Sequence, residues 1–313
     1  MSISLTGRSF LTLKDFSADE IRTFLSRAHE VKQEPRNGKP RSRFAGKNLA
    51  LLFEKRSTRT RCAFETAFGE EGGNSVFLST ADIHLGAKET LEDTARVFGR
   101  MFDGIQYRGF GQQIAETFAK YSGVPVYNGL TNSYHPTQVL ADFMTIEDRL
   151  GILRGLNLCY VGDGRNNVAV SLAIGCAKLG INLTIASPQE LRPSRGLLDD
   201  VEQSAAKTDA KIRYTSDVGD GVNGANVLYT DVWTSMGEES EVEHRKEILT
   251  KYQVNAGLME QTGKPDTIFL HCLPAVRGQE VTANVIDGPQ SAVWDQAENR
   301  KHSIKALMLE TMF

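Results

Sequence analysis

The sequence lacks an excess of charge of one sign, a cluster of cysteines and a long apolar run. Its 313 residues hold 36 Lys and Arg against 39 Asp and Glu, a net charge of −3, which argues against a nucleic-acid or anionic-membrane partner. The longest stretch without a charged side chain, Tyr121 to Ala141, contains two prolines and two glycines and is not expected to span a membrane. The first residues lack the apolar core of a signal peptide.

The cysteines also exclude a class of protein. Cys62, Cys159, Cys176 and Cys272 form no CxxC pair, so a reducing cytoplasm is expected rather than a disulfide framework. Apolar residues make up 40% and charged residues 24% of the chain, as in ordinary globular proteins. At about 150 residues per domain, this length predicts two domains.

Apolar runs of strand length alternate along the chain with amphipathic stretches of helix length. Strands are expected at 48–53, 75–78, 105–107, 124–127, 158–161, 181–186, 211–214, 226–230 and 267–270. Helices are expected at 17–31, 57–70, 89–101, 111–121, 135–150, 166–178, 198–207 and 298–312. This alternation predicts an α/β protein with two domains, each a parallel sheet flanked by helices.

A hydroxyl-rich and basic segment stands where the first strand meets a helix. Ser57, Thr58 and Thr60 supply hydroxyl groups and Arg59 a guanidinium fork, beside the N–H groups of a helix N-terminus. These parts suit a small phosphorylated ligand, although the segment is not a Walker loop. The alternative is an ordinary helix cap with a solvated basic face. Arg61 cannot share a helix face with Arg59 and is expected to pair structurally.

A second strand-to-helix loop, Gly162 to Asn167, invites a nucleotide interpretation. It departs from GxGxxG because Asn167 takes the place of the third glycine. No acidic residue ends the following strand, 182–186, where a ribose partner is expected. Dinucleotide binding is therefore not predicted.

Several motifs together resemble a known family. The sequence contains Ser57-Thr58-Arg59-Thr60-Arg61, Tyr107-Arg108-Gly109, His135-Pro136-Thr137-Gln138 and His271-Cys272-Leu273-Pro274. These motifs resemble those of the aspartate and ornithine carbamoyltransferases. Asp231-Val232-Trp233-Thr234-Ser235-Met236-Gly237 resembles the ornithine-binding loop of the ornithine branch, and the HPLPR string of the aspartate branch is replaced by His271 to Ala275.

The resemblance implies a domain division and a reaction. Residues 1–134 would bind carbamoyl phosphate, 135–150 would form a linking helix, and 151–297 would bind ornithine. The C-terminal helix, 298–313, would pack back on the first domain. The implied reaction is attack by the δ-amine of L-ornithine on carbamoyl phosphate, which gives L-citrulline and phosphate through a tetrahedral intermediate. It requires no metal and no other cofactor.

The resemblance also implies roles for particular residues. Arg108, His135 and Cys272 would form the catalytic set, with His135 donating to the carbamoyl oxygen and Cys272 near the attacking amine. Carbamoyl phosphate would be bound by Ser57, Thr58, Arg59, Thr60, His84, Arg108, His135, Gln138, Cys272, the backbone carbonyl of Leu273, and Arg300. Ornithine would be bound by Asn167, Asp231, Ser235 and Met236, with Asp231 facing the α-ammonium group.

Two loops carry further expectations. Relatives often have Gln at the position of His84, which reaches into a neighbouring subunit, so active sites shared within a homotrimer are expected. We hypothesise that His84 adds positive charge for phosphate at mildly acidic pH. The acidic stretch after Gly237 is expected to act as a lid on ornithine, the alternative being an ordinary surface turn.

Other functions stay open at this point. One is a carbamoyltransferase for putrescine or a related amine, although such relatives depart from Ser235-Met236-Gly237. Another is a binding protein for a phosphorylated ligand that has lost catalysis. The carbamoyl-directed residues count against a pure binder. Arginine metabolism and a cytoplasmic location are expected, whereas the anabolic or catabolic direction is not decided.

Overall fold

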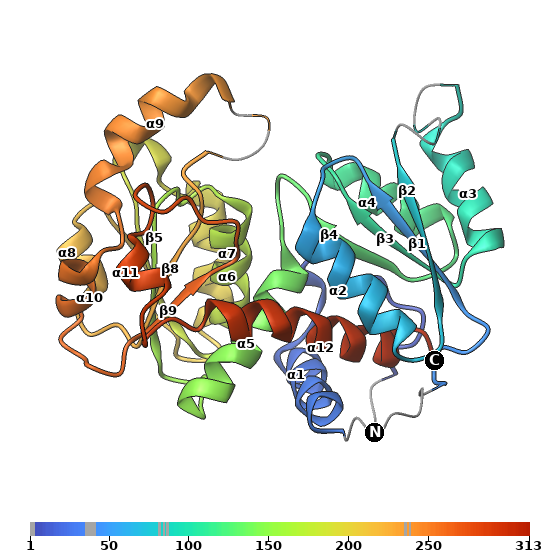
Figure 1. Ribbon diagram of the computed structural model, residues 1–313, viewed down its shortest axis with the longest axis horizontal. Coiled ribbons are helices and arrows are strands. Elements are labelled where there is room, and N and C mark those ends of the chain that lie inside the picture. The colour runs from blue at the N-terminus through green and yellow to red at the C-terminus, as the bar shows by residue number, and fades with distance from the viewer. Residues whose placement is uncertain are drawn as a thin grey trace. The chain divides into compact units, whose positions relative to one another are not determined.

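The computed structural model describes residues 4–34, 42–80, 83, 85, 88–234, 237 and 239–313 (Figure 1). The chain divides into unit 1, Met1–Met144 with Glu298–Phe313, and unit 2, Thr145–Ala297. Among the described residues, none of the helices combines the length and apolar character that crossing a bilayer demands.

Unit 1 contains a four-stranded parallel sheet in the order β2-β1-β3-β4. Its strands are β1 Asn48–Phe53, β2 Asn74–Ser79, β3 Gly104–Arg108 and β4 Val126–Leu130. Its helices are α1 Ala18–Gln33, α2 Thr58–Gly69, α3 Leu91–Met101 and α4 Gln112–Tyr121, together with the first part of α5 Pro136–Leu150 and most of α12 Val293–Thr311. A short 3-10 turn, Leu13–Asp15, precedes α1.

Alternating residues of these strands separate the two faces of the unit 1 sheet. Ala50, Leu52 and Ile105 pack with Phe98 of α3 and Phe118 of α4 in one apolar cluster. Tyr127 of β4 serves the opposite face, because its ring lies 6.2 Å from that of Phe64 in α2 and its hydroxyl is 2.8 Å from that of Thr311 in α12. The C-terminal helix is therefore part of the unit 1 core, as predicted.

Unit 2 contains a five-stranded parallel sheet in the order β7-β6-β5-β8-β9. Its strands are β5 Asn157–Val161, β6 Asn182–Ala186, β7 Ile212–Thr215, β8 Val227–Thr230 and β9 Ile268–His271. Its helices are α6 Asn167–Leu179, α7 Arg195–Ala205, α8 Val218–Val222, α9 Val242–Leu249, α10 Ala256–Glu260 and α11 Ala283–Ile286. Its described residues also form 3-10 turns at Gln189–Leu191, Glu239–Glu241 and Thr250–Tyr252.

The predicted fold class is confirmed, with corrections at the ends of elements. The strand expected at 124–127 is Val126–Leu130, because Pro125 has no N–H for the ladder and the pairing with β3 continues past a bulge at Tyr107 and Arg108. The helix expected at 198–207 begins at Arg195, after its cap Ser194. The final helix begins at Val293, earlier than the predicted residue 298.

Candidate functional site

The segment that the sequence predicts to bind a phosphorylated ligand lies at the N-terminus of α2. Ser57 caps this helix, and its Oγ accepts a hydrogen bond from the Thr60 N–H at 3.2 Å. No acidic side chain stands in the first turn, so the positive end of the helix dipole is not neutralised there. This end of α2 is therefore suited to an anion. Arg61 instead pairs with Glu65 at 2.9 Å and lies over the Phe77 ring, which agrees with its predicted structural role.

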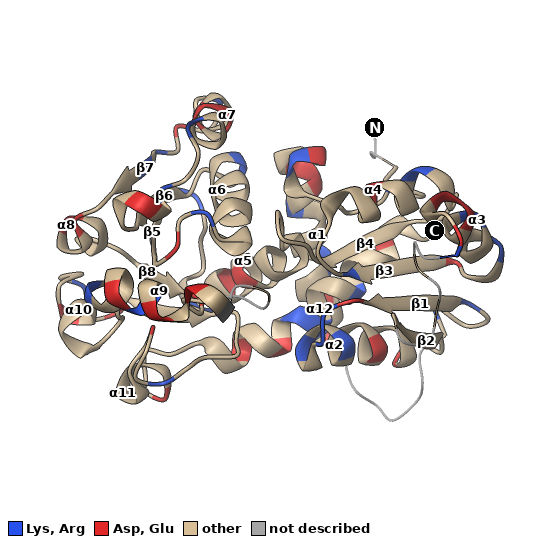
Figure 2. Cartoon of the chain, turned by 90° about the horizontal axis from the view of Figure 1, so that it is seen from above, with Lys and Arg blue, Asp and Glu red and all other residues tan. Residues whose placement is uncertain are grey.

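Two buried arginines converge on Thr60. Its Oγ1 accepts from Arg108 Nη1 and from Arg300 Nη2, both at 3.2 Å, and all three side chains are buried. Arg300 Nη1 also donates to Gln138 Oε1 at 2.9 Å, while Gln138 Nε2 donates to Asp142 at 2.8 Å. The amide of Gln138 therefore presents its oxygen toward the cationic groups. Figure 2 marks Lys and Arg in blue on α2 and α12, the helices that carry Arg59 and Arg300.

His135 belongs to the same cluster, immediately before α5. Its side chain is buried, and burial lowers its pKa well below the ordinary 6.5. The positive charges of Arg300, Arg108 and Arg59 act in the same direction, in that order of size. His135 is therefore a neutral imidazole at physiological pH, able to donate one hydrogen bond. We call Arg59, Thr60, Arg108, His135, Gln138 and Arg300 the cationic cluster.

Glycine is required at the third position of the Tyr107-Arg108-Gly109 motif for a steric reason. A Cβ at Gly109 would collide with the Glu54 carboxylate and the Tyr107 hydroxyl. That hydroxyl donates to Glu54, which also accepts the Phe110 N–H at 3.2 Å. The end of β3 is thereby tied to the segment that leads into α2, and this tie places Arg108 close to Thr60.

A second polar group gathers at the carboxyl ends of β5, β8 and β9 in unit 2. Asp231, which follows β8, accepts from Asn166 Nδ2 at 3.1 Å and from the Val232 N–H at 2.8 Å. Cys272, which follows β9, directs its Sγ to Asp231 Oδ1 at 3.0 Å and is partly exposed. The carboxyl ends of neighbouring parallel strands meet at one edge of a sheet, which is where such folds bind ligands.

The loop between β5 and α6 contributes the neighbouring amides. Asn166 caps α6 by accepting the Val168 N–H at 2.7 Å, and Asn167 is the first helical residue. The residue that contacts Asp231 is thus Asn166, for which sequence reasoning predicted no role. The paired asparagines after Asp163 and Gly164 are the signal that could have identified it.

Arg245 of α9 is another residue that sequence reasoning missed. Its side chain is buried; Nη1 donates to Asp163 Oδ2 at 2.5 Å and to the Trp233 carbonyl at 3.2 Å. Asp163 in turn accepts the Arg165 N–H at 2.8 Å. Arg245 therefore joins the β5–α6 loop, through Asp163, to the segment after β8, through the Trp233 carbonyl. An arginine between His244 and Lys246, in a helix with several charged residues, gives no sequence signal for this contact.

Asp231, His271 and Cys272 each point a potential metal-ligand atom at the others, all within 4.8 Å. The His271 ring is already occupied, because Nδ1 accepts the Leu273 N–H at 2.8 Å and Nε2 lies 3.2 Å from Glu280 Oε1. A cation at this position would have to displace one of these bonds. The donor set as built fits a hydrogen-bonded site better than a metal site.

Several predicted site residues lie outside the described residues. These are His84, Ser235 and Met236, so the expected shared-site loop and part of the expected lid are not described. Among the other predicted residues, the structure brings those of unit 1 into or beside the cationic cluster, and it brings Asp231 and Cys272 into contact in unit 2. Leu273 follows Cys272 directly.

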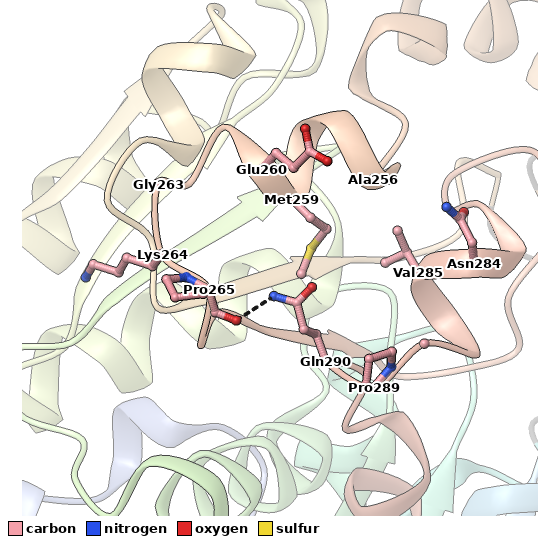
Figure 3. Close-up of a pocket in the computed structure, with 11 residues that line it drawn as sticks. Ala256, Met259, Glu260, Gly263, Lys264, Pro265, Asn284, Val285, Pro289 and Gln290 are labelled. Carbon is pink, nitrogen blue, oxygen red and sulfur yellow. Dashed lines mark hydrogen bonds between the residues drawn. The ribbon is translucent and has the colours of Figure 1, made fainter.

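A pocket of about 460 Å³ lies elsewhere in unit 2, and its lining residues are drawn in Figure 3. It is lined by residues that include Met259, Lys264, Pro265, Asn284 and Gln290, and Gln290 Nε2 donates to the Pro265 carbonyl at 3.2 Å. Lys264 and Pro265 precede β9, whereas Cys272 follows it, so the pocket and the polar group lie at opposite ends of this strand. None of the predicted site residues that the structure describes lines the pocket.

Comparison with known proteins covers almost the whole chain. Residues 8–148 match the family described as aspartate/ornithine carbamoyltransferase, carbamoyl-P binding domain, and residues 154–311 match aspartate/ornithine carbamoyltransferase, Asp/Orn binding domain. An ornithine carbamoyltransferase of Caldanaerobacter subterraneus subsp. tengcongensis is 61% identical over 312 residues, covering 100% of both chains.

Further similarities come from a catabolic enzyme and a solved structure. The catabolic ornithine carbamoyltransferase of Bacillus licheniformis is 49% identical, covering 99% of this chain and 98% of that one. The structure of ornithine carbamoyltransferase from Pyrococcus furiosus aligns with a TM-score of 0.95 at 46% identity, covering 99% of both chains.

Proposed function

Because the chain belongs to the aspartate/ornithine carbamoyltransferase family, we propose that it transfers the carbamoyl group of carbamoyl phosphate to the δ-amine of L-ornithine. It is a carbamoyltransferase, and the proposal concerns its amine substrate and its mechanism. The products would be L-citrulline and phosphate. The observation that carries the proposal is the cationic cluster, in which two buried guanidinium groups converge on one hydroxyl at the positive end of α2.

In the proposed mechanism the cationic cluster binds the phosphate and polarises the carbamoyl group. Ser57, Thr58, Arg59 and Thr60 hold phosphate oxygens through hydroxyl, guanidinium and backbone donors. Arg108 bridges phosphate and the carbamoyl oxygen, and Arg300 closes the ring of charge. The Gln138 oxygen and the Leu273 carbonyl accept from the carbamoyl NH2.

Neutral His135 donates to the carbamoyl oxygen, where negative charge develops in the tetrahedral intermediate. Its lowered pKa is consistent with this role, because the imidazole keeps one N–H to donate and does not change its charge across the working pH range. Catalysis then consists of positioning and charge stabilisation, with no covalent enzyme intermediate.

Ornithine needs different binding partners from carbamoyl phosphate. The polar side chains at the carboxyl ends of β5, β8 and β9 support a role of unit 2 in binding it. Asp231 faces the α-ammonium group, and Asn167, with the backbone of Ser235 and Met236, receives the α-carboxylate. Cys272 stands beside the δ-amine. The matched family domain, named for aspartate or ornithine binding, spans these residues.

The δ-amine must lose its proton before it attacks. A lysine-like amine has a reference pKa of about 10.4 and is almost fully protonated at neutral pH. We expect kcat/KM for ornithine to rise between about pH 6 and pH 9 as the neutral amine becomes available. A flat profile over this range would show that deprotonation of ornithine does not limit the reaction.

An amine panel tests the proposed substrate. Purified protein is given carbamoyl phosphate with ornithine, putrescine, lysine or aspartate, and each carbamoylated product is measured by mass spectrometry. Ornithine should give the highest kcat/KM, because Asp231 and Asn167 supply partners for both of its α-groups. Faster turnover of putrescine would identify putrescine as the preferred substrate, and absence of citrulline would overturn the proposal for ornithine.

The proposal extends to the assembly and its setting. We propose a homotrimer in which His84 reaches the carbamoyl phosphate site of a neighbouring subunit, acting in arginine metabolism in the cytoplasm. Sedimentation equilibrium tests the trimer. Mixing inactive His84→Ala and inactive Arg59→Ala subunits tests the shared site, because some mixed trimers would hold one intact site. No recovered activity would contradict sharing.

A further inference from the structure

The segment that follows β9 has an unusual backbone. Leu273 has φ +59°, in the left-handed region that favours glycine, and among the described residues only Asp209 is another non-glycine with positive φ. A branched apolar side chain gains nothing from this conformation by itself. The surrounding contacts therefore hold Leu273 in place.

One of these contacts comes from the preceding histidine. The Leu273 N–H donates to His271 Nδ1 at 2.8 Å. Because Nδ1 accepts, the proton of a neutral imidazole resides on Nε2, and Nε2–H donates to Glu280 Oε1 at 3.2 Å. Both side chains are 0% exposed, so water does not substitute for either bond. His271 thus has one tautomer and one ring orientation.

Glu280 completes the arrangement by holding a second point of the same loop. Its Oε1 also accepts the Val276 N–H at 2.6 Å. The strand end of the loop is fixed as well, because the His271 N–H donates to Gln296 Oε1 at 2.9 Å. The ring and the carboxylate therefore fasten the backbone at residues 273 and 276 from inside the unit 2 core.

We propose that His271, oriented by Glu280, is a positioning residue that aims the Leu273 carbonyl at the carbamoyl NH2. This inference rests on the proposed function, in which that carbonyl accepts from the NH2. His271 does not touch substrate. It fixes the peptide plane that contains the Leu273 N–H, and this plane constrains the backbone that leads to the Leu273 carbonyl. Its effect is therefore specific to the NH2 end of carbamoyl phosphate.

Two substitutions separate the two ring nitrogens. In His271→Asn, Oδ1 occupies the position of Nδ1 and still accepts the Leu273 N–H, but the reach to Glu280 is lost. In His271→Gln, the terminal amide occupies the position of Nε2 and still donates to Glu280, but the acceptor for Leu273 is lost. We expect His271→Gln to raise the KM for carbamoyl phosphate about tenfold, the worth of one buried hydrogen bond, and His271→Asn to raise it about threefold or less.

Acetyl phosphate is the diagnostic probe, because it carries a methyl group where carbamoyl phosphate carries NH2. Its inhibition constant should change less than about twofold in His271→Gln, because a methyl group donates no hydrogen bond to the Leu273 carbonyl. Equal weakening of both compounds would show a general structural effect and overturn the inference. So would a His271→Asn variant that binds carbamoyl phosphate no better than His271→Gln. The exposed pair of His244 and Glu190 provides the matched control His244→Gln, expected to behave as wild type.

Backbone amide exchange gives a readout that does not depend on activity. Exchange in the peptide that contains Leu273 should speed up about tenfold in His271→Gln and stay near wild type in His271→Asn. Unchanged exchange in His271→Gln would overturn the positioning role even with altered kinetics. Absence of citrulline from the wild-type protein would instead overturn the proposed function and the substrate part of this inference, while the exchange result would still decide the role of His271 in the loop.

Discussion

The guanidinium of Arg300 donates through Nη1 to the amide oxygen of Gln138 at 2.9 Å, across 162 positions of sequence. The same guanidinium reaches Thr60 through Nη2. Arg300 therefore ties the C-terminal helix to the start of α5 and to the first turn of α2. Like charges gathered in this way repel one another, and an anion relieves that repulsion.

The first prediction concerns Arg59, which lies close enough to His135 to lower its pKa. Arg59→Gln should raise the KM for carbamoyl phosphate about 30-fold or more, the worth of a charge-assisted hydrogen bond. The free energy of unfolding without ligand should be unchanged or slightly higher, because one repelling charge is removed. Urea unfolding and initial-rate kinetics measure the two quantities.

The control for Arg59 is on the same helix. Arg61→Gln removes an equal charge from an exposed pair with Glu65 and should leave the KM within about twofold of wild type. Saturating phosphate should stabilise the wild type and the Arg61 variant by about 2–3 kcal/mol, and the Arg59 variant by much less. Equal stabilisation of all three proteins would remove Arg59 from the phosphate site.

His302 gives a prediction for stability against pH. Burial lowers its pKa from 6.5 to about 4 in the folded protein. The unfolded chain therefore binds a proton below pH 6.5 that the folded protein does not bind until pH 4, so stability is lost as the pH falls through this window. The loss from this one group approaches about 3 kcal/mol.

Replacing His302 with Gln removes the titrating group and should flatten this part of the stability curve. Urea unfolding at several pH values between about 7 and 4 gives the difference in the free energy of unfolding between the two proteins. Groups that titrate in the same way in both proteins do not contribute to this difference. Parallel curves for wild type and His302→Gln would show that His302 has the same pKa in both states.

The fold could be predicted from the sequence where local signals are long and uninterrupted. β1 was predicted at its observed bounds because Asn48–Phe53 is one apolar run, and α1 begins where Ser17 and Glu20 form a capping box. The helix α9 was missed, and so were α8, α10 and α11, which have four or five residues each. Helices this short take their stability from burial of residues such as Val222 and Leu258 in the core, which no local pattern displays.

Motifs in the sequence predicted which residues form the candidate site, but they did not predict which of these residues contact one another. The hydroxyl-rich start of α2 has a local physical explanation. The meeting of Thr60 with Arg300, 240 positions apart, depends on where α12 packs, and only the family resemblance suggested it. The pairing of His271 with Glu280 was not predicted, because nothing in the sequence distinguishes a buried glutamate nine positions after a histidine from an acid on the surface.

Asp231 provides a test of how ornithine is oriented. Its carboxylate lies 3.0 Å from Cys272 Sγ, so contact distance alone does not separate an α-ammonium partner from a δ-amine partner. Asp231→Asn should weaken inhibition by norvaline, which keeps the α-ammonium group and lacks the δ-amine, by about 30-fold. Inhibition by pentanoate, which lacks both amines, should change little. Equal effects on the two inhibitors would indicate that Asp231 serves another part of the substrate.

Arg245 and Asp163 supply the last prediction, on the cost of breaking a buried ion pair. Arg245→Met removes the buried cation of Asp163, leaves only the half-exposed Arg165 at 3.4 Å, and should lower the free energy of unfolding by about 3 kcal/mol. Adding Asp163→Asn should recover part of this loss, because the buried negative charge is then gone. The matched control is Arg213→Met, whose exposed pair with Asp220 should change the free energy of unfolding little. Because Arg245 joins the β5–α6 loop to the segment after β8, the single variant should also raise the KM for ornithine more than the KM for carbamoyl phosphate. A stability loss no larger than that of the Arg213 control would show that the Asp163 carboxylate is solvated or protonated without Arg245.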